Sequence, residues 1–240
     1  MKKLLLGVLL TSFVAVSYGK PMSKKDIKWL ESQEAVKDIG CNEYSDRTYS
    51  KQKKGKVEIA ESVFKTDKLF DESKLTCELT EDNDIFSVIV IEKAIIDGKK
   101  VEVYHSSSSG YVNVTNDPFD DWSFKCQKDA MTDEVACGMN QNGFTIEKDS
   151  NGYRIQIGYE HFPESLAYIR VDKGKPIESE RNGMYSRETA KLIVDSLSDE
   201  SDVTIRYTRW PIQKPVDKKM NMEGFNSAKK AMDILLSSYK

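Results

Sequence analysis

The sequence predicts an α+β protein, an antiparallel β-rich sheet or sandwich with an N-terminal helix and two C-terminal helices packed on it. Short apolar segments alternate with turn signals such as Asp97-Gly98 and Asn151-Gly152. Cys126 and Cys137 fall opposite each other if the chain turns midway between them, after Met131. Strands do not alternate regularly with helices, so a parallel sheet is not expected.

In the first half of the chain, residues 23–40 have the apolar spacing of a helix that begins with a capping serine and stops at a glycine. Residues 41–80 are polar, and we expect them to be mostly irregular apart from short apolar pieces. Apolar runs predict strands at 85–91 and 111–115. The four serines and the glycine at 106–110 predict a flexible loop.

A polar break at 116–121 precedes a second half that predicts five strands, a helix, a strand and a final helix. Ser186 is a suitable N-cap for a helix that runs to about Leu197. The final helix has an apolar stripe made of Phe225, Ala228, Met232 and Leu235. We therefore divide the chain into an N-terminal disulfide-stapled region, 20–115, and a C-terminal β-rich domain, 116–240.

The first nineteen residues have the layout of a secretory signal peptide. Two lysines precede an apolar run of 13 residues, and the small residues Ser17 and Gly19 stand before a predicted cut at Lys20. The run is shorter than the roughly 20 residues that span a bilayer. Its short basic start and leucine-rich core are typical of bacteria. We expect a periplasmic or secreted bacterial protein with no transmembrane segment after cleavage.

Charge argues against nucleic acid as a partner. Residues 1–19 hold two of the 36 Lys and Arg and none of the 39 Asp and Glu, so the remaining chain has a net charge of −5. Both signs are scattered along it, and no basic face is predicted. The expected partner is an unidentified protein or envelope component.

The remaining chain has four cysteines, Cys41, Cys77, Cys126 and Cys137. An even number in an exported chain predicts disulfide bonds. Hairpin geometry favours the pair Cys126–Cys137, which leaves Cys41–Cys77 by elimination. No C-x-x-C motif is present, so a redox or metal site is not expected.

We find no sequence signature of catalysis. The chain has no G-x-S-x-G, no H-E-x-x-H and no zinc-finger spacing. His105 and His161 are each expected to be surface or capping residues. The acidic group Asp117, Asp120 and Asp121 lacks the spacing and glycine of an EF-hand loop. We therefore assign no catalytic, cofactor-binding or metal-binding residue.

One segment is a candidate binding surface. Residues 206–211 alternate charged and aromatic side chains and end at a proline. They predict either an amphipathic strand with one ring in the core or an exposed site that contains Tyr207, Arg209 and Trp210. Asp120 joins these three as a residue that would line a groove between the two halves.

The second half of the chain resembles the invasion-associated locus B family of bacterial envelope proteins. The likeness rests on Asp121-Trp122, the cysteine pair around a hairpin, and Gly224-Phe225 followed by Ala228 near the end. The turn at 129–133 has a more limited likeness to accessory proteins of type VI secretion. The locus B family usually has a further cysteine pair downstream, which this chain lacks. The resemblance implies a secreted or periplasmic protein linked to the envelope or to host interaction, with no catalytic residues to carry over.

The expected function is that of an exported, non-enzymatic envelope or host-association protein that acts by binding or assembly. One alternative is a cell-wall or glycan hydrolase with paired carboxylates, which would show a deep cleft. Another is an inhibitor of a foreign hydrolase, which would show a protruding loop.

Overall fold

The computed structural model describes residues 20–21, 24–25, 28, 45–51, 57–65, 67–82, 85–115 and 120–239. The expected signal peptide, most of the expected N-terminal helix and Cys41 lie outside these ranges. Among the helices within them, none has the length and apolar character needed to cross a membrane.

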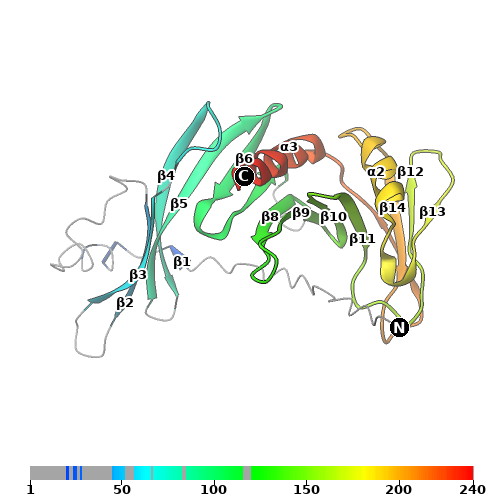
Figure 1. Ribbon diagram of the computed structural model, residues 1–240, viewed down its shortest axis with the longest axis horizontal. Coiled ribbons are helices and arrows are strands. Elements are labelled where there is room, and N and C mark those ends of the chain that lie inside the picture. The colour runs from blue at the N-terminus through cyan, green and yellow to red at the C-terminus, as the bar shows by residue number, and fades with distance from the viewer. Residues whose placement is uncertain are drawn as a thin grey trace.

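The larger sheet is an antiparallel meander in which each strand from β4 to β11 pairs with the next (Figure 1). Its strands are β4 (Ser73–Asp82), β5 (Ile85–Ile96), β6 (Lys99–Tyr104), β7 (Ser109–Asn113), β8 (Trp122–Lys128), β9 (Val135–Gln141), β10 (Phe144–Asp149) and β11 (Gly152–Ile157). At its other end β1 (Lys20–Pro21) pairs with β4, and β2 (Ser45–Lys51) pairs with both β5 and β3 (Val57–Lys65).

The expectation of irregular structure at 41–80 is wrong, because β2, β3 and most of β4 lie there. The ladder between β4 and β5 runs from Ser73↔Ala94 to Asp82↔Ile85. A sheet is held by backbone hydrogen bonds, so a polar strand can pair along its whole length with an apolar neighbour such as β5.

A second, four-stranded antiparallel sheet has the order β13-β12-β14-β15. Its strands are β12 (Tyr168–Val171), β13 (Ile177–Glu178), β14 (Val203–Thr208) and β15 (Pro215–Lys219). Helix α2 (Arg187–Asp195) contacts β11 and lies beside β12 and β14, whereas α3 (Phe225–Ser237) packs on β8 and β9 (Figure 1). The predicted α+β class, with antiparallel sheets and two helices packed on them, is confirmed.

Helix α2 begins where the sequence predicts. The Ser186 side chain accepts a hydrogen bond from the backbone N–H of Thr189 and caps α2. Helix α3 begins after Gly224, whose φ is +79°. A Cβ atom at Gly224 would lie 2.8 Å from Cγ1 of Val114, so both the backbone angle and the space require glycine.

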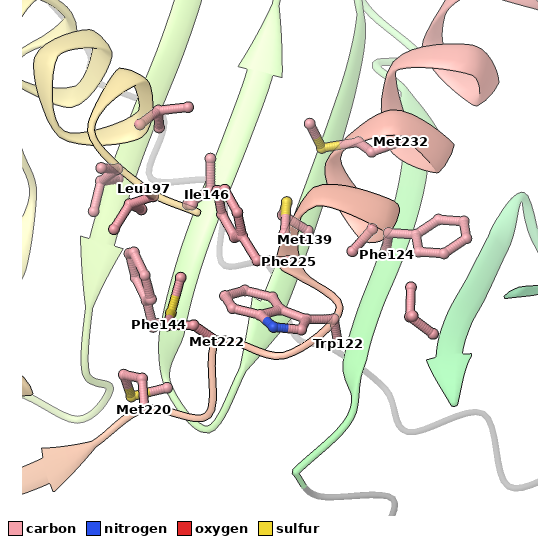
Figure 2. Packing of buried hydrophobic residues seen from close by; sticks show 14 of the residues in the cluster. Trp122, Phe124, Met139, Phe144, Ile146, Leu197, Met220, Met222, Phe225 and Met232 are labelled. Atoms are coloured by element: carbon pink, nitrogen blue, oxygen red, sulfur yellow. The ribbon is translucent and has the colours of Figure 1, made fainter. Parts of the chain in front are cut away.

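One hydrophobic core joins the two sheets and the two helices (Figure 2). The ring of Trp122 has no solvent exposure, and its centroid lies 5.9 Å from that of Phe144 and 5.5 Å from that of Phe225. The buried Ser227 hydroxyl donates to the carbonyl of Ile96 and fixes α3 to β5. The residues that carry the family resemblance thus lie mostly in the core.

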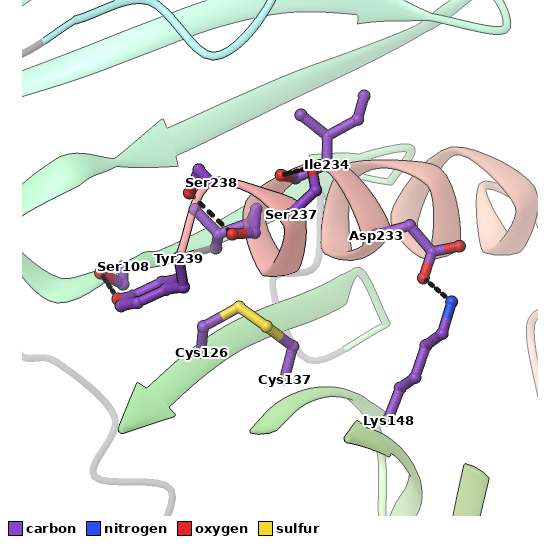
Figure 3. Close-up of a disulfide and its surroundings, with 10 residues drawn as sticks. Ser108, Cys126, Cys137, Lys148, Asp233, Ile234, Ser237, Ser238 and Tyr239 are labelled. Carbon is purple, nitrogen blue, oxygen red and sulfur yellow. Dashed lines mark hydrogen bonds and ion pairs between the residues drawn. A yellow bond between two sulfur atoms is a disulfide. The ribbon is translucent and has the colours of Figure 1, made fainter. Parts of the chain in front are cut away.

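The predicted pairing of Cys126 and Cys137 is confirmed. The two residues are direct register partners on β8 and β9, with Cα atoms 3.9 Å apart, and they form a disulfide. Both are buried beneath the C-terminal part of α3 (Figure 3). Cys77, on β4, is also disulfide-bonded. Its expected partner, Cys41, lies outside the described residues, so that pairing stays a prediction.

The expected division at residue 116 falls between two strands that pair with each other. β7 and β8 are joined from Ser109↔Lys125 to Val112↔Trp122. The core also combines Val101 and Val112 from the first region with residues of the second. The two regions therefore share one sheet and one core.

Candidate functional site

The candidate site is formed by two loops that run side by side, one after β11 and one after β14. The backbone N–H of Phe162 donates to the carbonyl of Thr208 at 2.9 Å. The N–H of Trp210 donates to the carbonyl of Glu160 at 2.6 Å. These bonds continue the antiparallel pairing beyond the strands, so the two loops hold each other in place.

Arg209 links the two loops through its side chain. Its Nε and Nη2 atoms donate to Oε2 of Glu160 at 2.8 and 2.5 Å. Its guanidinium carbon also lies 4.9 Å from the centroid of the Tyr159 ring, a cation–π contact. The hydrogen bond with Glu160 raises the pKa of Arg209, so the guanidinium stays charged.

Large apolar side chains are exposed around Arg209. The exposed fraction is 44% for Tyr159, 54% for Trp210 and 60% for Ile212. The Trp210 ring lies against that of Phe162, with the ring centroids 5.5 Å apart. We call this group the aromatic rim; its members are Tyr159, Phe162, Arg209, Trp210 and Ile212.

Tyr207 lies beneath the rim and is only 2% exposed. Gly158 allows this position, because a Cβ atom there would lie 2.4 Å from Cγ of Tyr207. Burial raises the pKa of Tyr207, and the neighbouring Tyr159 adds to the effect. The amphipathic-strand interpretation therefore describes β14, whereas the residues just beyond the strand form an exposed surface.

His161 also supports the rim from below. Its ring centroid is 5.8 Å from that of Tyr207, and its ring packs against Gly183. Burial lowers the pKa of His161, although the backbone of Ile157 and Gly158 acts in the opposite direction. The expectation of a surface or capping histidine is wrong at this position. The ring is a neutral packing element at neutral pH.

Asp120 contacts the turn between β9 and β10. Its Oδ1 atom accepts a hydrogen bond from Nδ2 of Asn142 at 2.8 Å, and the next residue, Gly143, approaches the Tyr159 ring. Asp121 is 7% exposed and caps the backbone N–H groups of Val114 and Thr115. In the part of the chain that the structure describes, no group of three or more acidic, His or Cys residues is arranged to hold a metal ion.

The structure thus places Tyr207, Arg209 and Trp210 together, whereas Asp120 bonds to Asn142 on the turn between β9 and β10. Sequence reasoning missed Tyr159, Phe162 and Ile212. The sequence does show two aromatic residues just after Gly158 and just before a proline, which is typical of a shaped loop. What it does not show is that β11 and β14 lie close enough for their loops to meet.

A second polar cluster surrounds Glu92, whose side chain has no solvent exposure. Its carboxylate accepts hydrogen bonds from the backbone N–H groups of Leu69 and Phe70 at 2.9–3.1 Å, and from the Ser73 hydroxyl. Nε2 of His105 lies 2.9 Å from Oε2 of Glu92. Glu92 therefore joins β5 to two loops that are distant in sequence.

These contacts explain the lowered pKa of Glu92. Two expectations for the neighbouring segment are also wrong. Burial alone would raise the pKa of Glu92, but the hydrogen bonds from His105, Ser73 and the backbone outweigh it and hold the pKa below 4.5. His105 is a partner of a buried carboxylate, not a surface residue. The expected loop at 106–110 begins with a 3₁₀ turn, His105–Ser107, and ends in β7.

Two surface hollows contain carboxylates, and each carboxylate has a cationic partner. A hollow of about 470 Å³ beside α3 includes Asp97 and Asp233. Asp97 pairs with Lys230 at 3.1 Å, and Asp233 pairs with Lys148 at 2.7 Å. A hollow of about 340 Å³ on the second sheet includes Asp217, which pairs with an arginine.

Comparison of the chain with models of known protein families, with curated proteins and with solved structures finds no match.

Proposed function

We propose that this chain is an exported protein of the bacterial envelope that acts by binding a protein partner through the aromatic rim. The observation that carries the proposal is the exposure of Tyr159, Trp210 and Ile212 around the charged Arg209. These residues are presented by two loops that hydrogen-bond to each other.

The residue types of the rim suit this function. Tryptophan, tyrosine and arginine are the residues that most often dominate binding energy at protein interfaces. A rigid surface also loses less conformational entropy on binding than a mobile one. Glu160 and Tyr159 hold Arg209 in place without a partner, so its side chain loses little conformational entropy on binding.

The envelope location is supported by the chain's N-terminal pattern and by its disulfide chemistry. The Cys126–Cys137 bond is typical of proteins that fold in an oxidising compartment. The resemblance to the locus B family adds support for an envelope role. Trp122, Phe225 and Ala228, which carry this resemblance, are buried in the core. The resemblance therefore does not extend to the residues of the aromatic rim.

The hydrolase alternative is less well supported by the two hollows. A general acid or nucleophile must be free to exchange a proton or attack a substrate. Asp97, Asp233 and Asp217 are each engaged by a lysine or arginine.

One observation favours the inhibitor alternative. The β8–β9 hairpin ends in a loop at 129–134, where Met131 is 93% exposed. The Asp129 carboxylate accepts hydrogen bonds from the N–H groups of Met131 and Thr132 at 2.7 and 2.8 Å, which fixes the loop. Inhibition of a hydrolase that Met131→Asp abolishes and Met131→Leu preserves would favour this function over the rim.

The proposed function is tested by binding of the purified, fluorescently labelled protein to washed bacterial envelopes and to cultured host cells. Trp210→Ala should weaken binding at least tenfold, because removing a central aromatic residue from an interface typically costs 2 kcal/mol or more. Leu192→Ala is the matched control, since Leu192 is 66% exposed but lies on α2, outside the rim. Saturable binding that both variants retain, or no binding to either surface, would contradict the proposal.

A further inference from the structure

The outer face of the second sheet has a hollow that belongs neither to the rim nor to the core. Along β12 and β14, Ile169 and Ile205 are fully buried, and the adjacent Arg170 and Arg206 are exposed on the opposite face. The hollow has a volume of about 340 Å³. It is lined by Tyr168, Arg170, Pro176, Thr204, Arg206 and Asp217.

Most charges on this face are neutralised by a neighbour. Arg206 donates to both carboxylate oxygens of Asp217 at 2.5 and 2.6 Å. Lys219 pairs with Asp202 at 3.2 Å. The backbone of Arg170 pairs with that of Thr204, but its side chain has no hydrogen bond and no ion pair with any residue that the structure describes. Among the residues that line the hollow, the charges of Arg206 and Asp217 cancel and the charge of Arg170 remains. Glu178, the register partner of Tyr168, lies at the edge of the hollow and is not one of its lining residues.

The other residues that line the hollow provide apolar surfaces and hydrogen-bonding groups. The Tyr168 and Pro176 rings provide apolar surfaces, and the Thr204 hydroxyl and the Asp217 carboxylate provide hydrogen-bonding groups. A ligand that uses the whole lining needs an apolar face, one negative charge and several hydroxyl groups. A sugar ring with a carboxylate has all three: its C–H face packs against the rings, its carboxylate binds Arg170, and its hydroxyls hydrogen-bond to Thr204 and Asp217.

We propose that this hollow binds an acidic sugar, that is, a uronic or sialic acid residue of a glycan. Small-molecule sites occupy about 300–1,000 Å³. The hollow lies at the lower end of that range, which suits a single ring. This site is separate from the aromatic rim and does not depend on the proposed protein partner.

The test uses the full chain and free sugars. Glucuronate and N-acetylneuraminate are titrated by ligand-observed NMR, with methyl glucoside as the neutral sugar and benzoate as an aromatic acid. Both sugar acids should bind with millimolar affinity, and the neutral sugar should not bind. Arg170→Gln should weaken binding at least tenfold without loss of folding, because the Arg170 side chain makes no hydrogen bond or ion pair within the described residues and the substitution keeps the backbone pairing with Thr204.

Arg181→Gln is the matched control, since Arg181 is another exposed arginine, with 76% side-chain exposure, outside the hollow. It should leave the affinity unchanged. The proposal is overturned if the sugar acids do not bind, or if the neutral sugar binds as tightly as they do. It is also overturned if benzoate binds more tightly than either sugar acid, or if Arg170→Gln keeps the affinity of the natural protein. Loss of rim-dependent binding to cells or envelopes would leave these titrations unaffected.

Discussion

The buried carboxylate of Glu92 connects two segments that are distant in sequence. Its carboxylate joins β5 to the backbone at Leu69 and Phe70 and to the His105 ring. A buried charge is tolerated only when its hydrogen-bonding capacity is filled, and here five contacts from four residues fill it.

Glu92→Gln should therefore destabilise the protein by roughly 2–4 kcal/mol, because glutamine removes the charge and turns one acceptor into a donor that faces other donors. Urea unfolding monitored by circular dichroism measures this difference. Glu78→Gln is the control, since Glu78 is exposed and its ion pair with Lys93 spans 3.7 Å; we expect a change within about 0.5 kcal/mol. Equal stability of the two variants would contradict this role of Glu92.

The same carboxylate gives a pH dependence with a defined sign. Its pKa in the folded protein lies below the ordinary value of 4.5. Its contribution to stability is therefore complete above about pH 4.5 and is lost as the pH falls through the folded-state pKa. The stability difference between the natural protein and Glu92→Gln should shrink in that acidic range. A difference that stays constant from pH 6 to pH 3 would contradict the assignment.

The sequence does not reveal the role of Glu92, because its partners are 13 to 23 residues away and belong to separate loops. The one signal is a charged residue within the apolar run of β5. Cys126 and Cys137 were easier to predict, because a hairpin fixes their register from local spacing alone. Tyr159 and Ile212 were missed because local spacing does not bring them together. Their loops meet only because β11 packs near β14.

At the scale of elements, the β8–β9 hairpin and α3 form a unit. The disulfide lies under the C-terminal part of α3, and Tyr239 just beyond the helix donates to the Ser108 hydroxyl (Figure 3). Sequence periodicity predicted both α2 and α3, because each has one buried stripe. It missed β13 and β15, which are only two and five residues long and are mostly exposed.

Non-reducing peptide mapping should recover a linked pair of peptides that contain Cys126 and Cys137. Because the two residues are 11 positions apart, chain-entropy arguments give the bond roughly 2–3 kcal/mol of stabilisation. Replacing both cysteines by alanine should lower the free energy of unfolding by about that amount. Free thiols at both positions in protein taken from an oxidising compartment would show that the bond does not form.

Leu235→Ala should cost about 2–5 kcal/mol, because it removes a buried side chain from the face of α3 that packs on the core. Thermal and urea unfolding measure this loss. Leu192→Ala makes the same chemical change at an exposed position of α2 and should alter stability by less than about 0.5 kcal/mol. An unchanged midpoint in Leu235→Ala would mean that α3 is peripheral to the core.

At the scale of the whole molecule, the meander and its core continue across residue 116. A fragment of residues 116–240 would leave the edge of β8 unpaired and would remove Val101, Val103 and Val112 from the core. We expect it to lack a cooperative unfolding transition, whereas the full chain unfolds as a unit across this junction. A fragment that unfolds cooperatively by itself would show that the division at 116 is a true domain boundary.

The central claim is that the aromatic rim is where a partner binds. Hydroxyl-radical footprinting of the full chain, alone and bound to the envelope or cell surface that retains it, tests this claim at residue level. We predict protection of Tyr159, Trp210 and Ile212, with Met131 and Leu192 labelled equally in both states. Protection of Met131 alone would contradict this proposal and move the binding surface to the β8–β9 hairpin loop. Absence of protection at both Met131 and the rim residues would also contradict it.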